Sequence, residues 1–592
     1  MTLAAHKIAQ RESNVSKDYR LFQRLFRTIG VLRLQRHLSA ETMVGTILAI
    51  WCKSSFPNLP SSKLRKSKVL MRNKQVQAFA QMLAQQSFLE ATYWLSSTYA
   101  LLCSDKHRES LAMYFTPPSL TTRLIEDLKD NGAKFDSQIF CDPACGGAAF
   151  LAPLALKISQ ALKDRGASPK RVLNHIKTHL LGIDADPTLC ALSRHFLLMT
   201  LYAEVIVTRH VPRFSIRCGN SLSLTNSILG RVDVVVCNPP YRKLKAHEVH
   251  RYKNAFPEVT RLQPNLYSLF MCLCVKLLRV GGTAALVTPT SYLSGQYFSE
   301  LRTFMMNNVD ILSLGTLSDR NRVFINVQQE TALTIIRRRK QYSLPQIRAS
   351  ISLVSKDGTY KKVGKCVLLN SGSAWPVPRC KGDIELLKCA TKSKYRLQDY
   401  GYRVRIGAFV WNRDKRETYS SLGQVWDAQA NNIFPLIWSS DIGRDGSLRF
   451  TGRQKKNGEA RFVELANDER NIVIQNQSVV LQRVTSKEQP KRLVAAVVPR
   501  KLLTRFDGYI GENHTVILEQ EVRSPKLTPR QLANLLGTPV IDRYFRCISG
   551  STNVSAFELS QLVLPDPTEL KRYLDKGHSM AEAAKRALLG VQ

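Results

Sequence analysis

Acidic residues are scarce in this chain of 592 residues, which carries 46 Asp plus Glu against 86 Lys plus Arg. The resulting formal charge of +40 repels itself, and a polyanionic partner would relieve that repulsion. The basic residues are spread along the whole chain rather than gathered on one amphipathic helix, so a nucleic-acid backbone fits better than a membrane surface. The charge balance therefore indicates a nucleic-acid-binding protein.

The chain also lacks long apolar runs, paired cysteines and low-complexity tracts. Its first twenty residues contain no signal-peptide hydrophobic segment, and the tract MVGTILAIW at residues 43–51 is too short to cross a bilayer. The 13 cysteines include no CxxC pair, which argues against a thiolate metal site. We therefore expect a cytoplasmic protein in a reducing compartment.

The length is sufficient for two or three domains. Residues 1–108 predict a helical region, because apolar side chains recur three and four positions apart in segments such as QVQAFAQMLAQQSFLEATYWL. The same region is basic. It either adds a wall to a nucleic-acid groove or braces the next domain, and the sequence favours neither role.

Residues 109–342 predict an α/β domain in which helices cross over between the strands of a parallel sheet. The expected strands lie in QIFCDPA, HLLGIDAD, RFSIRCG, VDVVVCN, GGTAALVTP, ILSLGTL and ALTIIRRR. The first four end in turns that carry Asp, Asn, Gly or Pro. Because ligands bind outside the carboxyl ends of parallel strands, these four ends predict one pocket.

Residues 343–592 are less regular, with short β-like runs, and with Trp and Tyr interleaved among Arg and Lys. This composition suits contacts with phosphates and base edges, so we expect a separate DNA-contacting domain that ends in a basic helix over residues 570–590. For His514, a structural role is favoured over one that faces DNA. The candidate DNA contacts are Arg413, Lys415, Arg416, Arg444, Arg483, Lys487 and Lys491, although for each one alone a solvated surface charge is the simpler interpretation.

The first polar strand end, CDPACGGAAFL, combines an acid with small residues and two glycines. Gly146 and Gly147 permit positive φ and let a ligand approach the backbone, which predicts a nucleotide-sized pocket. The next strand ends in Asp184 and Asp186. We expect Asp184 to bind a ribose diol and Asp186 to cap the following helix, with Pro187 at its first position, although either acid could serve as the cap.

The strand VDVVVC is followed by Asn238, Pro239, Pro240 and Tyr241. An exocyclic amine is a poor nucleophile, because its lone pair is delocalised into the ring, and two fixed acceptors for its N–H groups improve it. The side-chain carbonyl of Asn238 and the backbone carbonyl of Pro239 supply two such acceptors, and the prolines stiffen the backbone. Tyr241 offers a flat face on which an extruded base can stack. The motif predicts methyl transfer to a flipped base, without a metal or a covalent intermediate.

With these motifs in this order, the sequence resembles the amino-methyltransferases of bacterial restriction-modification systems in the gamma arrangement. The resemblance implies an α/β, Rossmann-like class I methyltransferase domain with a C-terminal mixed α/β target-recognition domain. It implies S-adenosyl-L-methionine as cofactor and adenine N6 in double-stranded DNA as target, with any partner restriction endonuclease on a separate chain. The implied cofactor residues are Tyr114, Thr116, Pro117, Asp142, Ala144, Cys145, Gly146, Asp184 and Asn220, and the implied catalytic residues are Asn238, Pro239, Pro240 and Tyr241.

Two positions depart from that family. The third cofactor position, which is usually an Asp that accepts from the adenine amine of the cofactor, is Asn220 here. An aromatic residue that helps to hold the target base is expected near the strand ALTIIRRR, where this chain has Arg337, Arg338 and Arg339. Phe324 is a candidate substitute.

Several alternatives stay open. A cytosine-N4 methyltransferase needs the same two acceptors, although Asn238 rather than Ser before the prolines favours adenine. A protein-glutamine or ribosomal-RNA methyltransferase also carries Asn-Pro-Pro-Tyr, but such chains are more compact. A DNA-binding protein without turnover would be expected to have a damaged glycine turn or a damaged Asn-Pro-Pro-Tyr motif, and both are intact here. The segment PDPTELK is too compressed to arrange the carboxylates of a fused nuclease.

Overall fold

The computed structural model divides the chain into two compact units, Met1–Pro289 with Thr303–Lys362, and Thr290–Arg302 with Val363–Gln592. The second boundary lies about twenty residues beyond the expected one at 342. The structure describes residues 3–262, 264–317, 330–340, 348–355, 357–368, 372–424, 432–451, 453–455, 458–485, 489–549 and 553–590.

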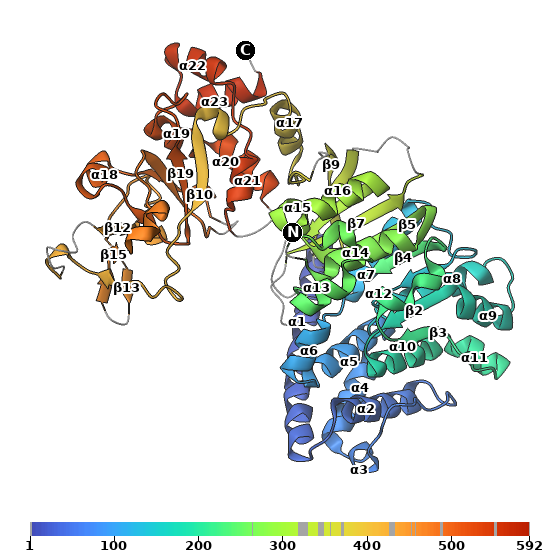
Figure 1. Ribbon diagram of the computed structural model, residues 1–592. Helices are drawn as coiled ribbons and strands as arrows, with labels where there is room; N and C mark the ends of the chain where they lie inside the picture. The colour runs from blue at the N-terminus through green and yellow to red at the C-terminus, as the bar shows by residue number, and fades with distance from the viewer. Residues whose placement is uncertain are drawn as a thin grey trace. The chain divides into compact units, whose positions relative to one another are not determined.

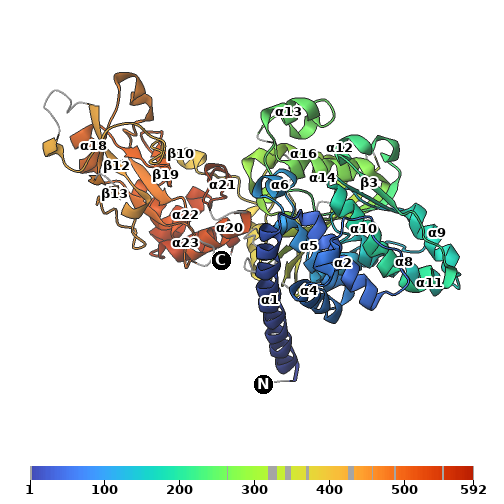
Figure 2. The same cartoon turned by 90° about the horizontal axis from the view of Figure 1, so that it is seen from below.

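The first unit begins with helices, as the apolar spacing predicts. They are α1 (Leu3–Gln35), α2 (Ala40–Ser55), α3 (Lys68–Met71), α4 (Lys74–Gln85), α5 (Phe88–Leu102) and α6 (Asp105–Leu111). Side-chain oxygens of Ser39, Asn73 and Ser87 cap α2, α4 and α5. The long helix α1 runs beside α4 and α5 (Figure 2).

These helices share one hydrophobic core with the sheet that follows. The rings of Phe22 and Trp94 lie 4.2 Å apart, and Trp51 lies 6.4 Å from Phe196, which belongs to the helix after the second strand. The same buried cluster continues to Val234 on the sheet. The helical region therefore braces the sheet, which is one of its two expected roles, and the groove-wall role stays a prediction.

One sheet of nine strands runs through the first unit in the order β3-β2-β1-β4-β5-β7-β6-β8-β9 (Figure 1). The strands are β1 (Phe140–Asp142), β2 (Leu180–Asp184), β3 (Ser215–Cys218), β4 (Val232–Cys237), β5 (Leu278–Pro289), β6 (Val309–Leu317), β7 (Thr331–Arg338), β8 (Arg348–Val354) and β9 (Tyr360–Val367). The seven expected strands are all present. The first five pair in parallel as predicted, whereas β7 is antiparallel to β5 and β6, a pairing that needs no crossover helix. The parallel pairing of β8 with β6 carries the sheet past residue 342.

Helices cover this sheet between the strands. They are α7 (Pro118–Asp130), α8 (Leu151–Lys163), α9 (Pro169–His179), α10 (Pro187–Thr200), α11 (Tyr202–Thr208), α12 (Ser221–Leu224), α13 (Ala246–Tyr252), α14 (Leu266–Leu277) and α16 (Ser299–Asn308). The short helix α15 (Ser291–Ser294) belongs to the second unit. Helices α8, α9 and α10 contact β2, and α14 contacts β4 and β5. Within the described residues, no single helix is long and apolar enough to cross a membrane, and α10 with α11 passes that test only as a pair bent by 73°.

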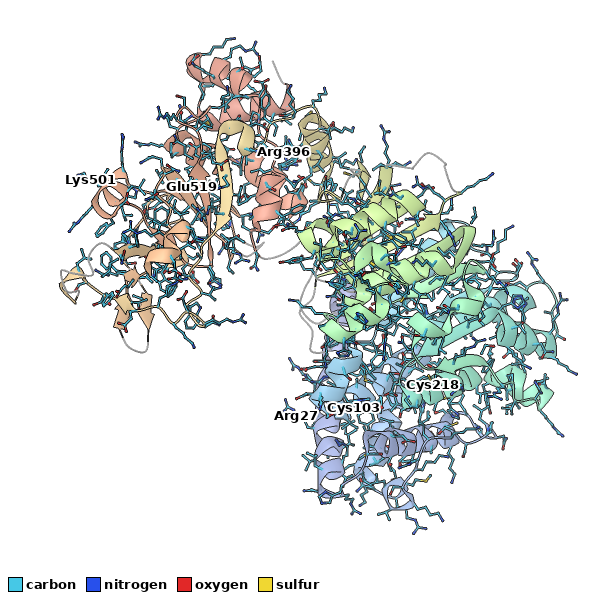
Figure 3. The ribbon with its side chains drawn as sticks, in the orientation of Figure 1. Arg27, Cys103, Cys218, Arg396, Lys501 and Glu519 are labelled. Atoms are coloured by element: carbon cyan, nitrogen blue, oxygen red, sulfur yellow. The ribbon has the colours of Figure 1, made fainter. Side chains whose placement is uncertain are left out.

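The second unit contains two four-stranded sheets, in the orders β10-β19-β16-β17 and β11-β15-β12-β18, and a hairpin of β13 and β14. The strands are β10 (Tyr402–Ile406), β11 (Thr418–Tyr419), β12 (Ile433–Ile437), β13 (Arg453–Lys455), β14 (Gly458–Ala460), β15 (Phe462–Glu464), β16 (Ser478–Gln482), β17 (Ala495–Val497), β18 (Ile510–Gly511) and β19 (Thr515–Gln520). Glu519, which is labelled in Figure 3, lies on β19. It accepts hydrogen bonds from Arg403 and Arg405 of β10, each at 3.1 Å. This unit thus has regular sheets that its irregular sequence pattern did not reveal.

Helices surround these sheets and close the chain. They are α17 (Lys381–Ala390), α18 (Arg500–Phe506), α19 (Pro529–Leu536), α20 (Pro539–Ile548), α21 (Ala556–Ser560), α22 (Pro567–Asp575) and α23 (Met580–Leu589). The prediction of one helix over residues 570–590 is wrong, because two helices share that stretch. Gly577 has a φ of +84° and its N–H bonds to the carbonyl of Leu574, which ends α22 before α23 begins.

Candidate active site

The polar ends of β1, β2, β3 and β4 lie around one cavity of about 940 Å³, a volume that includes the space open to solvent. The predicted residues that line it are Tyr114, Thr116, Asp142, Ala144, Cys145, Gly146, Asp184, Asn238 and Pro240. Four other predicted residues, Pro117, Asn220, Pro239 and Tyr241, are not among the described residues that line it. The structure therefore places one acceptor of the catalytic motif, the Asn238 amide, beside the expected cofactor residues.

The turn after β1 brings the backbone close to the next strand. Gly146 has a φ of +50°, and its N–H donates to Oδ2 of Asp184 at 2.9 Å. The second positive φ of the turn belongs to Ala148 at +62°, rather than to Gly147 as expected. Gly147 is needed for space instead, because a Cβ there would lie 1.9 Å from Oγ of Ser96 on α5.

Of the two acids at the end of β2, Asp186 is the helix cap, as predicted. Asp186 caps α10 by accepting from the N–H of Leu189 at 2.9 Å, and Pro187 stands at the first helical position. Asp184 accepts from the N–H of Gly146 through one oxygen and from that of Asp186 through the other, both at 2.9 Å. Since each carboxylate oxygen has two lone pairs, Asp184 keeps acceptor capacity for a ribose diol.

Burial raises the pKa of both acids in the cavity. The pKa of Asp184 rises to about 6, although hydrogen bonds from the backbone of Asp186 and Gly146 oppose the rise. The pKa of Asp142 rises to about 8, chiefly because the side chain is buried, with a smaller contribution from the charge of Asp184. A bound cation would favour the ionised form of both groups.

Two residues of the helical region, which the sequence did not single out, hold the capping acid from the other side. Tyr99 on α5 donates its hydroxyl to Oδ2 of Asp186 at 2.9 Å, and Nε2 of His107 on α6 lies 3.1 Å from the same oxygen. Nothing in the spacing of a helical segment marks such residues. The contact is visible only once the helices pack on the end of β2.

The donor set fits S-adenosyl-L-methionine. Asp184 suits the ribose hydroxyls, and the carboxylates of Asp142 and Asp184 suit a ligand that carries positive charge. Thr116, which also lines the cavity, has a buried Oγ1 without a hydrogen-bond partner among the described residues. A buried hydroxyl is stabilised when a ligand supplies that partner.

The predicted catalytic motif follows β4 and is tied to Tyr114, one of the predicted cofactor residues. The Asn238 amide donates through Nδ2 to the carbonyl oxygen of Tyr114 at 3.0 Å, which fixes the orientation of the amide. Its Oδ1 accepts from the hydroxyl of Tyr241 at 2.5 Å, and that hydroxyl also lies 2.9 Å from the carbonyl oxygen of Val287. The Tyr241 ring packs edge-on against Tyr267, with 6.1 Å between centroids.

The three arginines at the end of β7 have structural partners. Arg337 bonds to the carbonyl of Asn131, while Arg338 and Arg339 bond to carbonyls at Leu278 and Met306. They tie the end of β7 to neighbouring segments. Phe324, the candidate substitute, lies outside the described residues.

The basic residues predicted to contact DNA differ in their surroundings. Arg413, Lys415, Arg444 and Lys491 are exposed, whereas Arg416 pairs with Asp414 and Glu469, and Arg483 bonds to the carbonyl of Asn513. Lys487 lies outside the described residues. His514 lies with Nδ1 2.5 Å from Oε1 of the buried Glu512, in keeping with the favoured structural role.

Known proteins with similar sequences are restriction-modification enzymes. Residues 179–324 match the family described as Eco57I restriction-modification methylase. The chain is 25% identical over 478 residues to the Type II methyltransferase M.BsuBI of Bacillus subtilis, which covers 78% of this chain and 88% of that protein. It is 26% identical over 347 residues to the Type II methyltransferase M.PstI of Providencia stuartii, which covers 57% of this chain and 65% of that protein.

A solved structure extends the likeness in fold over nearly the whole chain. The Type IIL restriction-modification enzyme MmeI, solved in complex with DNA, matches with a TM-score of 0.53 and 12% identity over 93% of this chain and 86% of that one. At that identity the match concerns the fold alone. Residues 179–324 thus match the model of the Eco57I restriction-modification methylase family, and the chain is similar to Type II methyltransferases over most of its length, which supports a methyltransferase fold whose cofactor is S-adenosyl-L-methionine.

Proposed function

We propose that this enzyme methylates N6 of adenine at a specific sequence of double-stranded DNA, and that it extrudes the target base from the duplex to do so. One observation carries the proposal: the amide of Asn238 lines the same cavity as the cofactor acids Asp142 and Asp184. An acceptor for an exocyclic amine and a site for a methyl donor thus lie in one cavity. The similarity to Type II methyltransferases supports DNA as the substrate.

In this proposal, the chain's residues prepare the amine and keep water away. S-adenosyl-L-methionine supplies the electrophilic methyl group when it is bound. The carbonyls of Asn238 and Pro239 accept the two N–H bonds of the target amine, which directs its lone pair outward. The Asn238 carbonyl is held in place by the bond between Nδ2 and the Tyr114 carbonyl. Positioning and exclusion of water supply much of the rate.

Tyr241 has two tasks in this proposal. Its hydroxyl bonds to Asn238 Oδ1 in this structure, so it must release that oxygen when the target amine arrives. Its ring then supplies the face on which the extruded base stacks. Extruding a base costs about a few kcal/mol, and this stacking offsets part of that cost. Burial keeps the phenol protonated by raising its pKa, so Tyr241 acts as a donor and not as a base.

We further propose that the domain division expected from the sequence reflects function, with the C-terminal part recognising the target. Arg413, Lys415 and Arg444 support this role, because all three are exposed cations on loops of the second unit. Arginine bonding twice to guanine is the commonest specific contact in such domains. A partner restriction endonuclease would be a separate chain.

The test is transfer of a radioactive methyl group from S-adenosyl-L-methionine to DNA, followed by digestion to nucleosides and identification of the labelled one. We expect N6-methyl-2′-deoxyadenosine from the wild type and at least about a hundredfold less label with Asn238→Ala, a loss on the scale of removing one fixed polar group from an active site. Asn174→Ala, at an exposed position of α9, is the matched control and should retain full transfer.

Each other outcome has a defined meaning. Labelled N4-methyl-2′-deoxycytidine would show that cytosine and not adenine is the target, since the cytosine amine needs the same two acceptors. Transfer to no DNA substrate at all, by protein that binds the cofactor, would overturn the enzyme assignment and favour a DNA-binding protein without turnover.

A further inference from the structure

Asn220, a predicted cofactor residue at the end of β3, uses both polar atoms of its side chain for hydrogen bonds within the protein. Its Oδ1 accepts from the backbone N–H of Leu222 at 3.1 Å and so caps α12. Its Nδ2 donates to the hydroxyl of Tyr252 at 2.7 Å. Among the described residues, Gly219, Ser221 and Tyr252 line the cavity, and Asn220 does not. Of the two side chains joined by this bond, Tyr252 is therefore the one that lines the cavity.

The direction of these two bonds is determined by chemistry. A backbone N–H can only donate, so the atom of Asn220 that faces Leu222 must be the oxygen, and the atom that faces Tyr252 must be the NH₂ group. An amide NH₂ group can only donate, so the Tyr252 oxygen accepts. The phenol proton of Tyr252 is consequently directed away from Asn220 and is available to a ligand in the cavity.

Tyr252 is held at the cavity wall by its helix. It is the last residue of α13, and it is 7% exposed. At the start of this segment, the guanidinium of Arg242 bonds to both carboxylate oxygens of Glu248 at 2.8 and 2.6 Å, and its Nε donates to the carbonyl of Ser110 at 2.9 Å. The hydrogen bonds from Arg242 lower the pKa of Glu248 to about 2, so the pair stays ionised at neutral pH. Through Arg242, which directly follows the predicted catalytic motif, the helix is thus tied to Ser110 on α6.

We propose that Tyr252 recognises the adenine ring of S-adenosyl-L-methionine by donating its phenol proton to a ring nitrogen, and that Asn220 is the positioning residue that sets the direction of this bond. An acid at position 220 would accept the phenol proton, and the tyrosine oxygen could then only accept from the adenine amine. With Asn220 in place of an acid, Tyr252 therefore recognises a ring nitrogen of the adenine and not its amine. This inference rests on the identity of the cofactor and is independent of which DNA base is methylated.

The experiment measures binding of S-adenosylhomocysteine by isothermal titration calorimetry, together with its 1-deaza, 3-deaza and 7-deaza analogues, in each of which one ring nitrogen is replaced by C–H. We expect one analogue to bind the wild type about 3- to 10-fold more weakly than the parent compound, the loss that corresponds to one net hydrogen bond. Tyr252→Phe should bind the parent more weakly by a similar factor and should no longer distinguish that analogue. Tyr202→Phe, which removes a hydroxyl bonded to the Pro57 carbonyl outside the cavity, is the matched control and should behave as the wild type.

Asn220→Asp tests the direction of the bond. This variant should no longer distinguish the deaza analogue from the parent compound. It should instead bind the 6-oxo analogue, which lacks the amine, more weakly than the wild type binds that analogue. Melting temperatures without ligand show that each variant is folded. The proposal is overturned if the wild type binds all three deaza analogues as well as the parent, or if Tyr252→Phe keeps the wild-type ratio between parent and analogues.

Discussion

The hydroxyl of Tyr241 lies 2.5 Å from Oδ1 of Asn238, the oxygen proposed to accept from the target amine. The same hydroxyl lies 2.9 Å from the Val287 carbonyl, so two carbonyl oxygens share one phenol proton. Because the Val287 carbonyl can accept the hydrogen bond from this hydroxyl by itself, Tyr241 can release Oδ1 and still have a hydrogen-bond partner. The motif therefore contains both the acceptor and an internal group that satisfies it before the base arrives.

Replacing Tyr241 separates the role of the ring from the role of the hydroxyl. Tyr241→Phe frees Oδ1 and keeps the stacking face, so we expect kcat/KM for methyl transfer to stay within about threefold of the wild type. Tyr241→Ala removes the face, and we expect a loss of about 10- to 100-fold, since base stacking on an aromatic contributes about 1 to 3 kcal/mol. Steady-state transfer to a DNA duplex measures both values. Equal impairment of the two variants would show that the hydroxyl, and not the ring, is the essential part.

Cofactor binding should strengthen as the pH rises from about 6 to about 8. The pKa of Asp184 is raised to about 6 and that of Asp142 to about 8, so both groups hold protons that a cationic ligand displaces. Calorimetry in buffers of different ionisation enthalpy should detect this proton release, and Asp142→Asn should abolish the part that occurs near pH 8. Affinity that is independent of pH across this range would contradict the prediction.

The same pKa values predict the pH dependence of stability for the protein without cofactor. Both carboxyls have a folded pKa above the ordinary value of 3.8, so their protonated forms stabilise the fold below about pH 4. This contribution is lost as the pH rises through about 6 and about 8. We expect the difference in melting temperature between Asp142→Asn and the wild type to grow in favour of the variant from pH 5 to pH 8, by differential scanning fluorimetry. A difference that stays constant over that range would show that Asp142 is already ionised in the folded protein at pH 5.

The sequence predicted the strands of the α/β domain because each short apolar run ends in a polar turn, and it predicted the Asp186 cap because Asp followed by Pro is a strong helix start. It did not reveal Tyr252, Tyr99 or His107, because an isolated polar residue within a helical segment carries no sign of what it will face. Those contacts are set by tertiary packing. Gly147 shows the same limit, since its need for space depends on Ser96 some fifty residues earlier.

The helical region should influence cofactor binding through Asp186. Tyr99 and His107 both contact Oδ2 of Asp186, whose backbone N–H donates to Asp184. Tyr99→Phe leaves a buried carboxylate oxygen with one partner fewer, so we expect a loss of about 1 to 3 kcal/mol in stability, by chemical denaturation, and weaker binding of S-adenosylhomocysteine. His107→Gln, which can still donate, should be milder. Unchanged cofactor affinity in destabilised Tyr99→Phe would limit these residues to a structural role.

Exposed cations of the second unit should govern the salt dependence of DNA binding. Arg413, Lys415 and Arg444 are each exposed. The slope of log K against log salt is negative, and each phosphate contact contributes about −0.9 to it. If each of the three residues neutralises one phosphate, replacing all three by Gln makes the slope shallower by about 2.7. Fluorescence anisotropy with a labelled duplex at several salt concentrations measures this slope. The matched control replaces three exposed cations of the first unit and should leave the slope unchanged. Lys170 and Lys177 lie on α9, and Arg213 lies just before β3. Equal changes in the two triple variants would mean that DNA responds only to net charge, and the three residues would then have no specific place in target binding.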